Sequence, residues 1–369
     1  MVINMHIAQI QTIPEIVNVL KVLTTGALAF LLAFLITPLW THILYKYKIG
    51  IKIKSQSVDG KKLTYVSKLH AKKSGTPTMG GVIIWLSILV LVFASHYIFP
   101  VIARWYDSAF IARLDFLSRP QVWLPLFVLA ASGILGLFDD VMSVRGWGKN
   151  KGGGMRFALR FWWLLVITAL GAWWFFYKLG WDQLHIPAVG DFSIGLWYIP
   201  LFIFVILFTA ISSNETDGLD GLNGGVLFMA FSSFAIIAFM QNKVDLSSFC
   251  AAVSGALLAF LWFNIYPARF FMGDTGAMSL GATMGIIAML TNSALALFII
   301  VFIYVMESGS VAIQLFSKRF FKRKVFLAAP IHHHFEAIGW PEPKITMRVW
   351  IFTIITSILG VIIGILGMG

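Results

Sequence analysis

The sequence predicts an all-α, polytopic membrane protein, and three observations support this fold class. Hydrophobic residues make up 59% of the 369-residue chain and charged residues only 12%, and the mean hydropathy is +0.85. Apolar runs of about twenty residues recur along the chain, which is the length a helix needs to cross a hydrocarbon core. The runs are continuous, whereas the strands of a membrane β-barrel alternate apolar and polar residues. The single cysteine, Cys250, excludes an internal disulfide.

We predict about ten transmembrane helices in one integral membrane domain that covers residues 1–369. The first apolar run lacks a preceding basic segment and a small-residue cleavage site, so we interpret it as a retained span and not as a signal peptide. The predicted spans are 17–41, 79–100, 121–138, 157–178, 195–213, 223–241, 248–267, 275–291, 295–316 and 347–367.

The distribution of basic residues among the connections predicts the orientation of these spans in the membrane. Of the 28 Lys and Arg residues, 22 lie in or beside alternate connections, and five lie in the opposite ones. Because cytoplasmic loops are enriched in Lys and Arg, the basic connections are predicted to be cytoplasmic and both termini extracytoplasmic. The net charge of +12 follows from this topology, and it also favours contact with anionic lipids or a phosphorylated substrate. The predicted cytoplasmic loops are 42–78, 139–156, 214–222, 268–274 and 317–346.

Most carboxylates near span ends fall on this cytoplasmic side, where they form a candidate active site. Ionisable residues at the edge of a membrane are costly and frequently functional. The carboxylates of the outward connections occur singly, and we expect them to be solvated. The cytoplasmic set is Asp139, Asp140, Glu215, Asp217, Asp220 and Asp274, and the outward set is Asp107, Asp115, Asp182, Asp191 and Asp245.

Two acidic motifs stand out within the cytoplasmic set. Asp217 and Asp220 are three residues apart, and each precedes a glycine. In a helix they would share one face, and in a loop the glycines would let a ligand approach the backbone; a plain polar turn is the alternative. Asp139 and Asp140 are predicted to end the third span, where the helix dipole disfavours anions. That cost favours a functional role over a solvated helix end.

Lys73 and Asp274 are candidates for binding an anion and a cation. Thr76-Pro77 resembles a helix start, and free backbone N–H groups there, together with Lys73, would bind an anion; a simple capped helix with topogenic lysines fits equally well. Asp274 lies at the start of the eighth span, where it is either a helix N-cap or a ligand.

Three consecutive histidines, His332, His333 and His334, lie in the last cytoplasmic loop. Consecutive histidines cannot all reach one tetrahedral zinc ion. We therefore favour an acid–base or phosphate-binding histidine over a zinc site, with a polar surface loop as the other alternative.

Carboxylates with few histidines favour Mg²⁺ or Mn²⁺ as the metal. A metal, lysines and a histidine at a lipid–water boundary indicate phosphoryl chemistry with a lipid-borne co-substrate. No Walker A motif is present, which disfavours an ATPase. The residues alone therefore indicate a metal-dependent, membrane-embedded phosphoryl-type transferase.

Five segments together resemble the phospho-N-acetylmuramoyl-pentapeptide transferase family of the polyprenyl-phosphate N-acetylhexosamine-1-phosphate transferase superfamily. They are GTPTMGG (75–81), FDD (138–140), TDGLDGL (216–222), FNIYPARFFMGDTG (263–276) and APIHHHFEAIGWPEP (329–343). The resemblance covers nearly the whole chain. It implies Mg²⁺-dependent transfer of phospho-N-acetylmuramoyl-pentapeptide from its UDP conjugate to undecaprenyl phosphate. The products would be lipid I and UMP, in the first membrane step of peptidoglycan synthesis.

The resemblance also implies roles for individual residues. Asp274 matches the magnesium-binding aspartate, and Asp139 matches the residue that activates the lipid phosphate, with Asp140 beside it. His332 completes the implied catalytic set. The implied substrate-binding residues are Lys73, Thr78, Asn214, Asp217, Gly218, Leu219, Asp220, Asn264, Phe271, Gln314, His333 and His334.

The chain departs from the family pattern at four positions. Ile211 stands where the family has an asparagine, and Glu215 replaces an apolar residue before Thr216. Ser143 and Ala158 stand where basic residues are common. These differences affect the expected phosphate contacts and leave the expected reaction class unchanged.

The resemblance implies a multi-pass protein of the bacterial cytoplasmic (inner) membrane that serves cell-wall biogenesis, cell shape and cell division. It allows a homodimer, and no nucleic-acid partner is expected. Two alternatives remain: a transferase that uses UDP-N-acetylglucosamine, and an ion-coupled transporter. A transporter would place acids near the middle of the bilayer, often between inverted repeats, whereas here the acids cluster at span ends on one face and we find no internal repeat.

Overall fold

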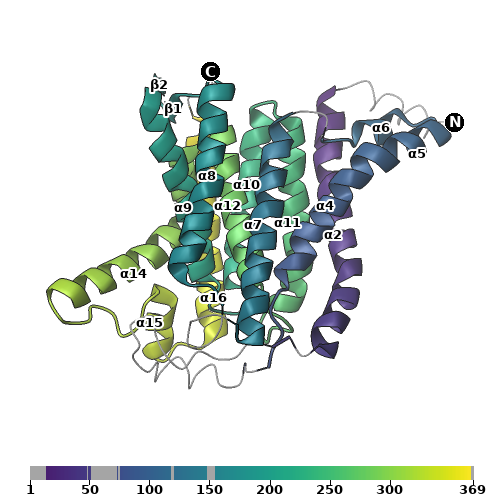
Figure 1. The fold of residues 1–369 in the computed structure, drawn as a ribbon. Helices are drawn as coiled ribbons and strands as arrows, with labels where there is room; N and C mark the ends of the chain where they lie inside the picture. Colours follow the sequence, from purple (N-terminus) through teal and green to yellow (C-terminus); the bar gives the residue numbers. More distant parts are fainter. Residues whose placement is uncertain are drawn as a thin grey trace.

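The chain folds into a bundle of membrane-length helices. The computed structural model describes residues 14–47, 49–50, 73, 75–117, 120–147 and 154–366. Within these ranges, eight helices are long and apolar enough to cross a membrane, and one bent helix pair makes nine. The long helices stand side by side (Figure 1), and many large apolar side chains on their outer faces are exposed. The prediction of an all-α polytopic membrane protein is confirmed.

The membrane helices follow the predicted order, and the short strands β1 and β2 were not predicted. In chain order they are α2 (Pro14–Lys46), α4 (Gly81–Phe93), η2 (Ala94–Ile98), α5 (Phe99–Trp105), α6 (Ala109–Arg113), α7 (Pro120–Arg145), α8 (Phe157–Trp173), η3 (Trp174–Lys178), β1 (Gln183–Ile186), β2 (Gly190–Ser193), η4 (Gly195–Trp197), α9 (Tyr198–Thr216), α10 (Leu222–Met240), α11 (Val244–Asn264), α12 (Asp274–Leu290), α13 (Ala294–Ile300), α14 (Phe302–Phe320), α15 (Ile331–Ala337) and α16 (Glu342–Ile365).

Helix α12 forms the core of the bundle. Every residue from Thr275 to Leu290 is buried, and the helix packs mainly against α7 and α9. Small residues allow this close packing, as is usual between membrane helices. A Cβ atom at Gly136 of α7 would lie only 2.5 Å from the backbone oxygen of Asp274. The absence of a side chain at Gly136 therefore lets α7 approach the start of α12 closely.

The ninth predicted span, 295–316, is wrong as a single straight helix. It is divided into α13 and α14, whose axes differ by 80°, and α14 leaves the bundle sideways (Figure 1). The break falls at Val301, where φ is −101° and ψ is 40°. The eighth predicted span corresponds to α12, which has only 17 residues and is too short to count among the eight membrane-length helices.

Helix α14 has an inverted amphipathic pattern. Its buried residues are largely polar and recur at helical spacing, whereas its apolar side chains Phe316 and Phe320 are 56% and 62% exposed. A helix that turns apolar residues outward and polar residues inward fits lipid on the outside and a polar interior. The buried polar residues are Glu307, Ser310, Gln314 and Ser317.

The end of the bundle at which α9 begins has the β1–β2 hairpin and a buried ion pair. The Nζ atom of Lys21 lies 2.7 Å from Oδ1 of Asp245 and donates to the backbone oxygen of Asp115. The Asp115 side chain in turn contacts His96 Nδ1 at 3.0 Å. The expectation that the outward carboxylates are all solvated is wrong for Asp245 and Asp115, because the carboxylate of Asp245 pairs with Lys21 and that of Asp115 contacts His96.

The two described chain ends lie at this same end of the bundle, as an even number of crossings requires (Figure 1). Leu366 reaches the hairpin, where its backbone oxygen is 3.3 Å from His185 Nε2. Much of the predicted loop 42–78 and part of the loop 139–156 lie outside the described residues, as do residues 1–13 and 367–369. The side of the membrane on which the ends lie stays a prediction.

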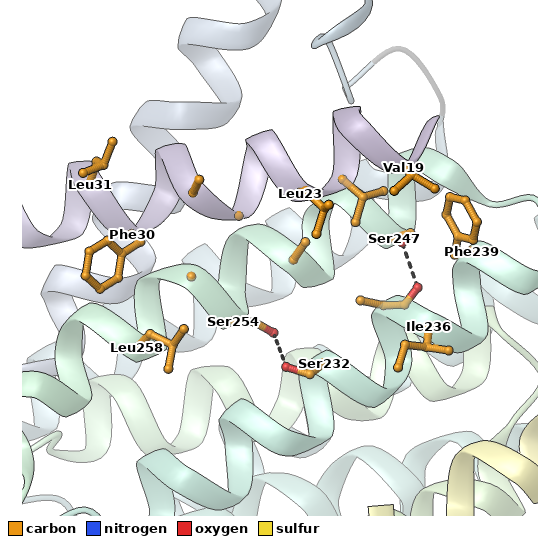
Figure 2. A pocket seen from close by; sticks show the side chains of 16 residues that line it. Val19, Leu23, Phe30, Leu31, Ser232, Ile236, Phe239, Ser247, Ser254 and Leu258 are labelled. Atoms are coloured by element: carbon orange, nitrogen blue, oxygen red, sulfur yellow. Dashed lines mark hydrogen bonds between the residues drawn. The ribbon is translucent and has the colours of Figure 1, made fainter. Parts of the chain in front are cut away.

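An apolar groove of about 720 Å³ opens between α2, α10 and α11. Figure 2 shows its lining, in which the hydroxyls of Ser232 and Ser254 bond to each other at 3.2 Å. These hydroxyls are therefore satisfied within the wall. None of the predicted site residues lines the groove, so the candidate active site is elsewhere.

Candidate active site

The predicted site residues gather at the end of the bundle away from the hairpin. Helices α7 and α9 end there, α12 and α16 begin there, and the short helix α15 lies beside them (Figure 1). Three contact groups can be distinguished at this end. They are centred on Asp274, on Lys73 and on His332, and the turn after α9 lies among them.

Asp140 binds the N-terminus of α12. Its carboxylate accepts hydrogen bonds from the backbone N–H groups of Asp274 and Thr275, at 3.2 and 3.1 Å. The prediction that Asp139 and Asp140 end a helix is wrong, because α7 continues to Arg145. The helix dipole that acts on Asp140 is instead that of the α12 N-terminus, which stabilises an anion.

Asp274 is the centre of the first contact group. Its Oδ2 lies 2.5 Å from Nη1 of Arg160, and its Oδ1 accepts from Nδ2 of Asn214 at 2.5 Å. The same Arg160 nitrogen lies 3.1 Å from Oδ2 of Asp139. Asp139 also accepts from the backbone N–H of Met155. Arg160 was absent from the predicted set, although it is an arginine within an otherwise apolar helix.

The donor set at Asp274 fits a magnesium ion with few protein ligands. Within the residues that the structure describes, no three His, Cys, Asp or Glu side chains are arranged to hold one metal ion. Magnesium commonly uses one or two carboxylates and completes its octahedron with water and substrate phosphates. Asp274 and the adjacent Asp139 offer carboxylate oxygens only, which are hard ligands that this ion prefers.

The turn between α9 and α10 follows the loop interpretation of the Asp217–Gly221 stretch. Helix α9 ends at Thr216, and Gly221 has φ 73°, which favours glycine. The two carboxylates have different partners. Asp217 lies within electrostatic range of Asp274 and close to the backbone of Gly273, whereas Asp220 accepts from the backbone N–H of Ala268 at 2.9 Å. The two acids of the turn therefore have different partners, Asp220 being bonded to Lys73 and to the loop before α12.

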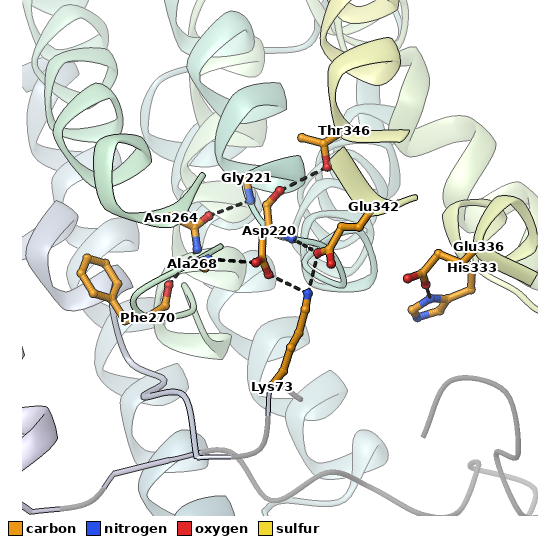
Figure 3. Close-up of polar contacts among 10 residues, drawn as sticks. All are labelled: Lys73, Asp220, Gly221, Asn264, Ala268, Phe270, His333, Glu336, Glu342 and Thr346. Atoms are coloured by element: carbon orange, nitrogen blue, oxygen red, sulfur yellow. Dashed lines mark hydrogen bonds and ion pairs between the residues drawn. The ribbon is translucent and has the colours of Figure 1, made fainter. Parts of the chain in front are cut away.

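Lys73 is the centre of the second contact group (Figure 3). Its Nζ lies 2.6 Å from Asp220 Oδ1 and 2.5 Å from Glu342 Oε1, and also 5.6 Å from the ring centre of Phe271. Glu342 additionally accepts from the backbone N–H of Asp220. Burial lowers the pKa of Lys73, but the two carboxylates outweigh it and raise the pKa above its ordinary value. Glu342 was missed, although it is an acid at the start of the last span.

The backbone part of the anion site expected at Thr76-Pro77 is wrong. Helix α4 begins at Gly81 and not at Thr76-Pro77. The N–H groups of Gly80 and Gly81 donate at 2.8 Å to the backbone oxygens of Phe271 and Met272. These donors are therefore unavailable to an anion, and Lys73 remains as the cationic group of this segment.

Three further predicted residues support the turn and its neighbours. Asn264 accepts from the backbone N–H of Gly221 at 3.0 Å and donates to the oxygen of Phe270 at 2.8 Å. Leu219 packs in an apolar cluster with Leu222 and Ile345. Thr78 is buried. In the structure these side chains are held by protein contacts, and their contacts with a substrate stay a prediction.

His332 is the centre of the third contact group. It lies in α15, and its Nδ1 is 2.9 Å from Oε2 of Glu307 in α14. Its ring occupies the space that a Cβ atom at Gly218 would need. The histidine segment is therefore a short helix against the acidic turn, and the interpretation as a polar surface loop is wrong for His332, which is 1% exposed.

The other two histidines point elsewhere. His333 Nδ1 lies 2.7 Å from Oε2 of Glu336, and His334 Nδ1 accepts from the backbone N–H of Leu327 at 3.2 Å. This divergence agrees with the argument against zinc. Gln314 binds the loop before the histidines: it donates to the oxygen of Phe326 at 2.8 Å and accepts from two backbone N–H groups.

Titration of the Asp217 carboxyl should make the free energy of unfolding depend on pH. Burial raises its pKa to about 7, and the nearby charge of Asp274 acts in the same direction. The unfolded carboxyl releases its proton at about pH 4. Between these values the native state binds more protons than the unfolded state, so the free energy of unfolding decreases as pH rises.

We therefore expect Asp217→Asn to raise the melting temperature above pH 7, with a difference that shrinks towards zero near pH 4. The measurement is thermal unfolding in detergent with EDTA across this range. Asp107→Asn, at an exposed position of the opposite end, is the matched control. Parallel stability curves for wild type and Asp217→Asn would contradict the assignment.

Comparison with known proteins identifies the family to which the chain belongs. Residues 122–292 match the model of glycosyl transferase family 4, and residues 73–84 match the phospho-N-acetylmuramoyl-pentapeptide-transferase signature 1. The signature thus includes Lys73 and Thr78.

Curated relatives extend the match to most of the chain. The phospho-N-acetylmuramoyl-pentapeptide-transferase of Chloroflexus aggregans is 33% identical over 354 residues, which cover 92% of this chain and 89% of the relative. The enzyme of the same name from Geobacillus thermodenitrificans is 35% identical over 340 residues, which cover 91% and 96%. The chain therefore belongs to the phospho-N-acetylmuramoyl-pentapeptide-transferase family and is a glycosyl-1-phosphate transferase.

Proposed function

We propose that the protein transfers phospho-N-acetylmuramoyl-pentapeptide from UDP to undecaprenyl phosphate, with Mg²⁺ as cofactor, to give lipid I and UMP. The observation that supports this reaction best is the contact group at Asp274. There, carboxylates of α7 and α12, Arg160 of α8 and Asn214 of α9 meet at one end of a membrane bundle. A reaction between a soluble nucleotide and a lipid headgroup requires a site at such an end of a membrane bundle.

The reaction requires an oxygen of the lipid phosphate to attack the sugar-linked phosphorus of the UDP conjugate. The new P–O bond forms as the bond from that phosphorus to the bridging oxygen breaks, and UMP leaves with the bridging oxygen. When bound at Asp274, Mg²⁺ neutralises diphosphate charge. Arg160 holds Asp139 and Asp274 together, so that both carboxylates face the same space without a large repulsion. Lys73 supplies a cation beside the turn 216–221.

The test is transfer by the purified protein with undecaprenyl phosphate and each UDP-sugar in turn. We expect UMP release and a lipid product with UDP-N-acetylmuramoyl-pentapeptide and Mg²⁺, and no lipid product in EDTA. Product from UDP-N-acetylglucosamine alone would assign the protein to the alternative transferase. The position of the site at one end of the bundle, and not at its middle, disfavours the transporter.

The proposed location is the bacterial inner membrane, with this site facing the cytoplasm. Cys250 is fully buried, so single cysteines introduced at exposed positions report the topology. In intact cells, an impermeant maleimide is expected to label Lys178→Cys, near the hairpin, and to leave Lys324→Cys, near the site, unlabelled. Permeabilised cells provide the control, in which both should react. The reverse pattern would overturn the orientation.

A further inference from the structure

Glu307 is an acidic residue inside an apolar predicted span, and the reaction described above does not use it. It lies in the second turn of α14, just after the 80° break, and is 1% exposed. Its Oε2 lies 2.9 Å from Nδ1 of His332 and 3.5 Å from the backbone N of the same residue. A carboxylate in this position is costly unless it has a specific partner, and that partner is His332.

The second nitrogen of the His332 ring has no hydrogen-bond partner among the described residues, although it is buried. It faces Gly218, and a Cβ atom there would overlap it. The ring is therefore fixed by Glu307 on one side and directs Nε2 to the turn 217–220 on the other. A buried donor without an acceptor costs about 1–3 kcal/mol, which a ligand that accepts from Nε2 would recover.

Helix α14 is itself held in place next to Glu307. The hydroxyl of Ser308 donates to Oε2 of Glu215 at 2.6 Å and lies 2.7 Å from the hydroxyl of Ser212. Both partners belong to α9, the helix that leads into the turn 217–220. Helix α14 is therefore bonded, one residue after Glu307, to the helix that leads into the turn, and Glu215 is the departure from the family pattern noted in the sequence.

We propose that Glu307 is a positioning residue for sugar-phosphate transfer. Its carboxylate orients the imidazole of His332 so that Nε2–H donates to an anionic oxygen of the diphosphate substrate bound beside the turn 217–220. This role rests on the proposed transfer reaction and on a substrate contact of His332. Glu307 acts through His332 and does not itself touch the substrate.

The charges around His332 favour the protonated ring that this role requires. Burial lowers the pKa of His332, but Glu307 outweighs it and raises the pKa. Glu336 and Glu342 act in the same direction, Glu215 lies within electrostatic range, and the ring of His333 is 4.1 Å away. A charged donor with a fixed direction forms stronger hydrogen bonds to phosphate oxygens than a neutral one.

The test compares Glu307→Gln with Glu215→Gln, because each removes one carboxylate near His332 but only Glu307 contacts the ring. For Glu307→Gln we expect kcat to fall by about tenfold to a hundredfold, as for a misplaced catalytic group. KM for the UDP substrate should change little. The alkaline limb of the pH–rate profile should move to lower pH, because loss of the carboxylate lowers the pKa of His332. Glu215→Gln should retain most of kcat, because the amide oxygen can still accept the hydrogen bond from the Ser308 hydroxyl.

Two further variants separate positioning from folding. Glu307→Asp keeps the charge but withdraws the carboxylate by one methylene, so kcat should fall while the alkaline limb stays in place. The double variant Glu307→Gln/His332→Gln should be no slower than His332→Gln alone. Equal losses for Glu307→Gln and Glu215→Gln, or additive losses in the double variant, would overturn the role. If the wild-type protein itself transfers no sugar phosphate, the proposed function is wrong, and this outcome differs from a failure of the Glu307 proposal.

Discussion

Asp274→Asn is expected to abolish Mg²⁺-dependent release of UMP, with a loss of about a thousandfold or more. Asp274 is the side chain on which Arg160 and Asn214 converge. The amide keeps the size and can still accept a hydrogen bond, but it lacks the charge that binds a divalent cation. A factor of a thousand corresponds to about 4 kcal/mol of transition-state stabilisation.

The variant should still fold, because Arg160 keeps its ion pair with Asp139 and Asp140 keeps both backbone hydrogen bonds at the start of α12. The measurement is UMP release at increasing Mg²⁺, with elution profile and melting temperature recorded for each protein. Asp107→Asn controls for loss of a carboxylate elsewhere. If Mg²⁺ still activates the Asp274→Asn protein, Asp274 is not a ligand of the metal.

The sequence predicts the bundle well, because the length and continuity of apolar runs are local properties. It does not predict the break in α14. No proline or glycine lies at Ile300–Phe302, so the residues at the break carry no local signal for a bend. The polar stripe of α14 was the available clue, since Glu307 lies within an apolar run where a charge is costly.

The site was predicted as a set of segments and not as a set of contacts. Asp139, Asp217 and Asp274 were identified because acids at span ends are unusual. Which residues pair with them depends on packing between elements far apart in the chain. Arg160 is 114 residues from Asp274, and Glu342 is 269 residues from Lys73, so no local pattern relates them. The different partners of Asp217 and Asp220 likewise depend on the turn conformation.

Lys73→Met is expected to weaken binding of the UDP substrate and also to destabilise the protein. The lysine side chain is 17% exposed, and its partners Asp220 and Glu342 are 4% and 11% exposed. Removal of the cation leaves two adjacent buried carboxylates, a change that costs about 3 kcal/mol for a buried ion pair. If Lys73 also contacts the substrate, loss of a charged hydrogen bond should raise KM by about tenfold to a hundredfold.

The double variant Lys73→Met/Glu342→Gln separates these two effects. The glutamine can still accept from the backbone N–H of Asp220, which Glu342 does in the wild type, and it removes the repulsion between the two acids. Asp220 keeps its hydrogen bond from Ala268. The melting temperature should therefore recover most of its loss. KM should stay raised, because the cation is still missing. Recovery of KM together with stability would show that Lys73 only holds the fold, whereas stability without substrate affinity would place Lys73 in the binding site.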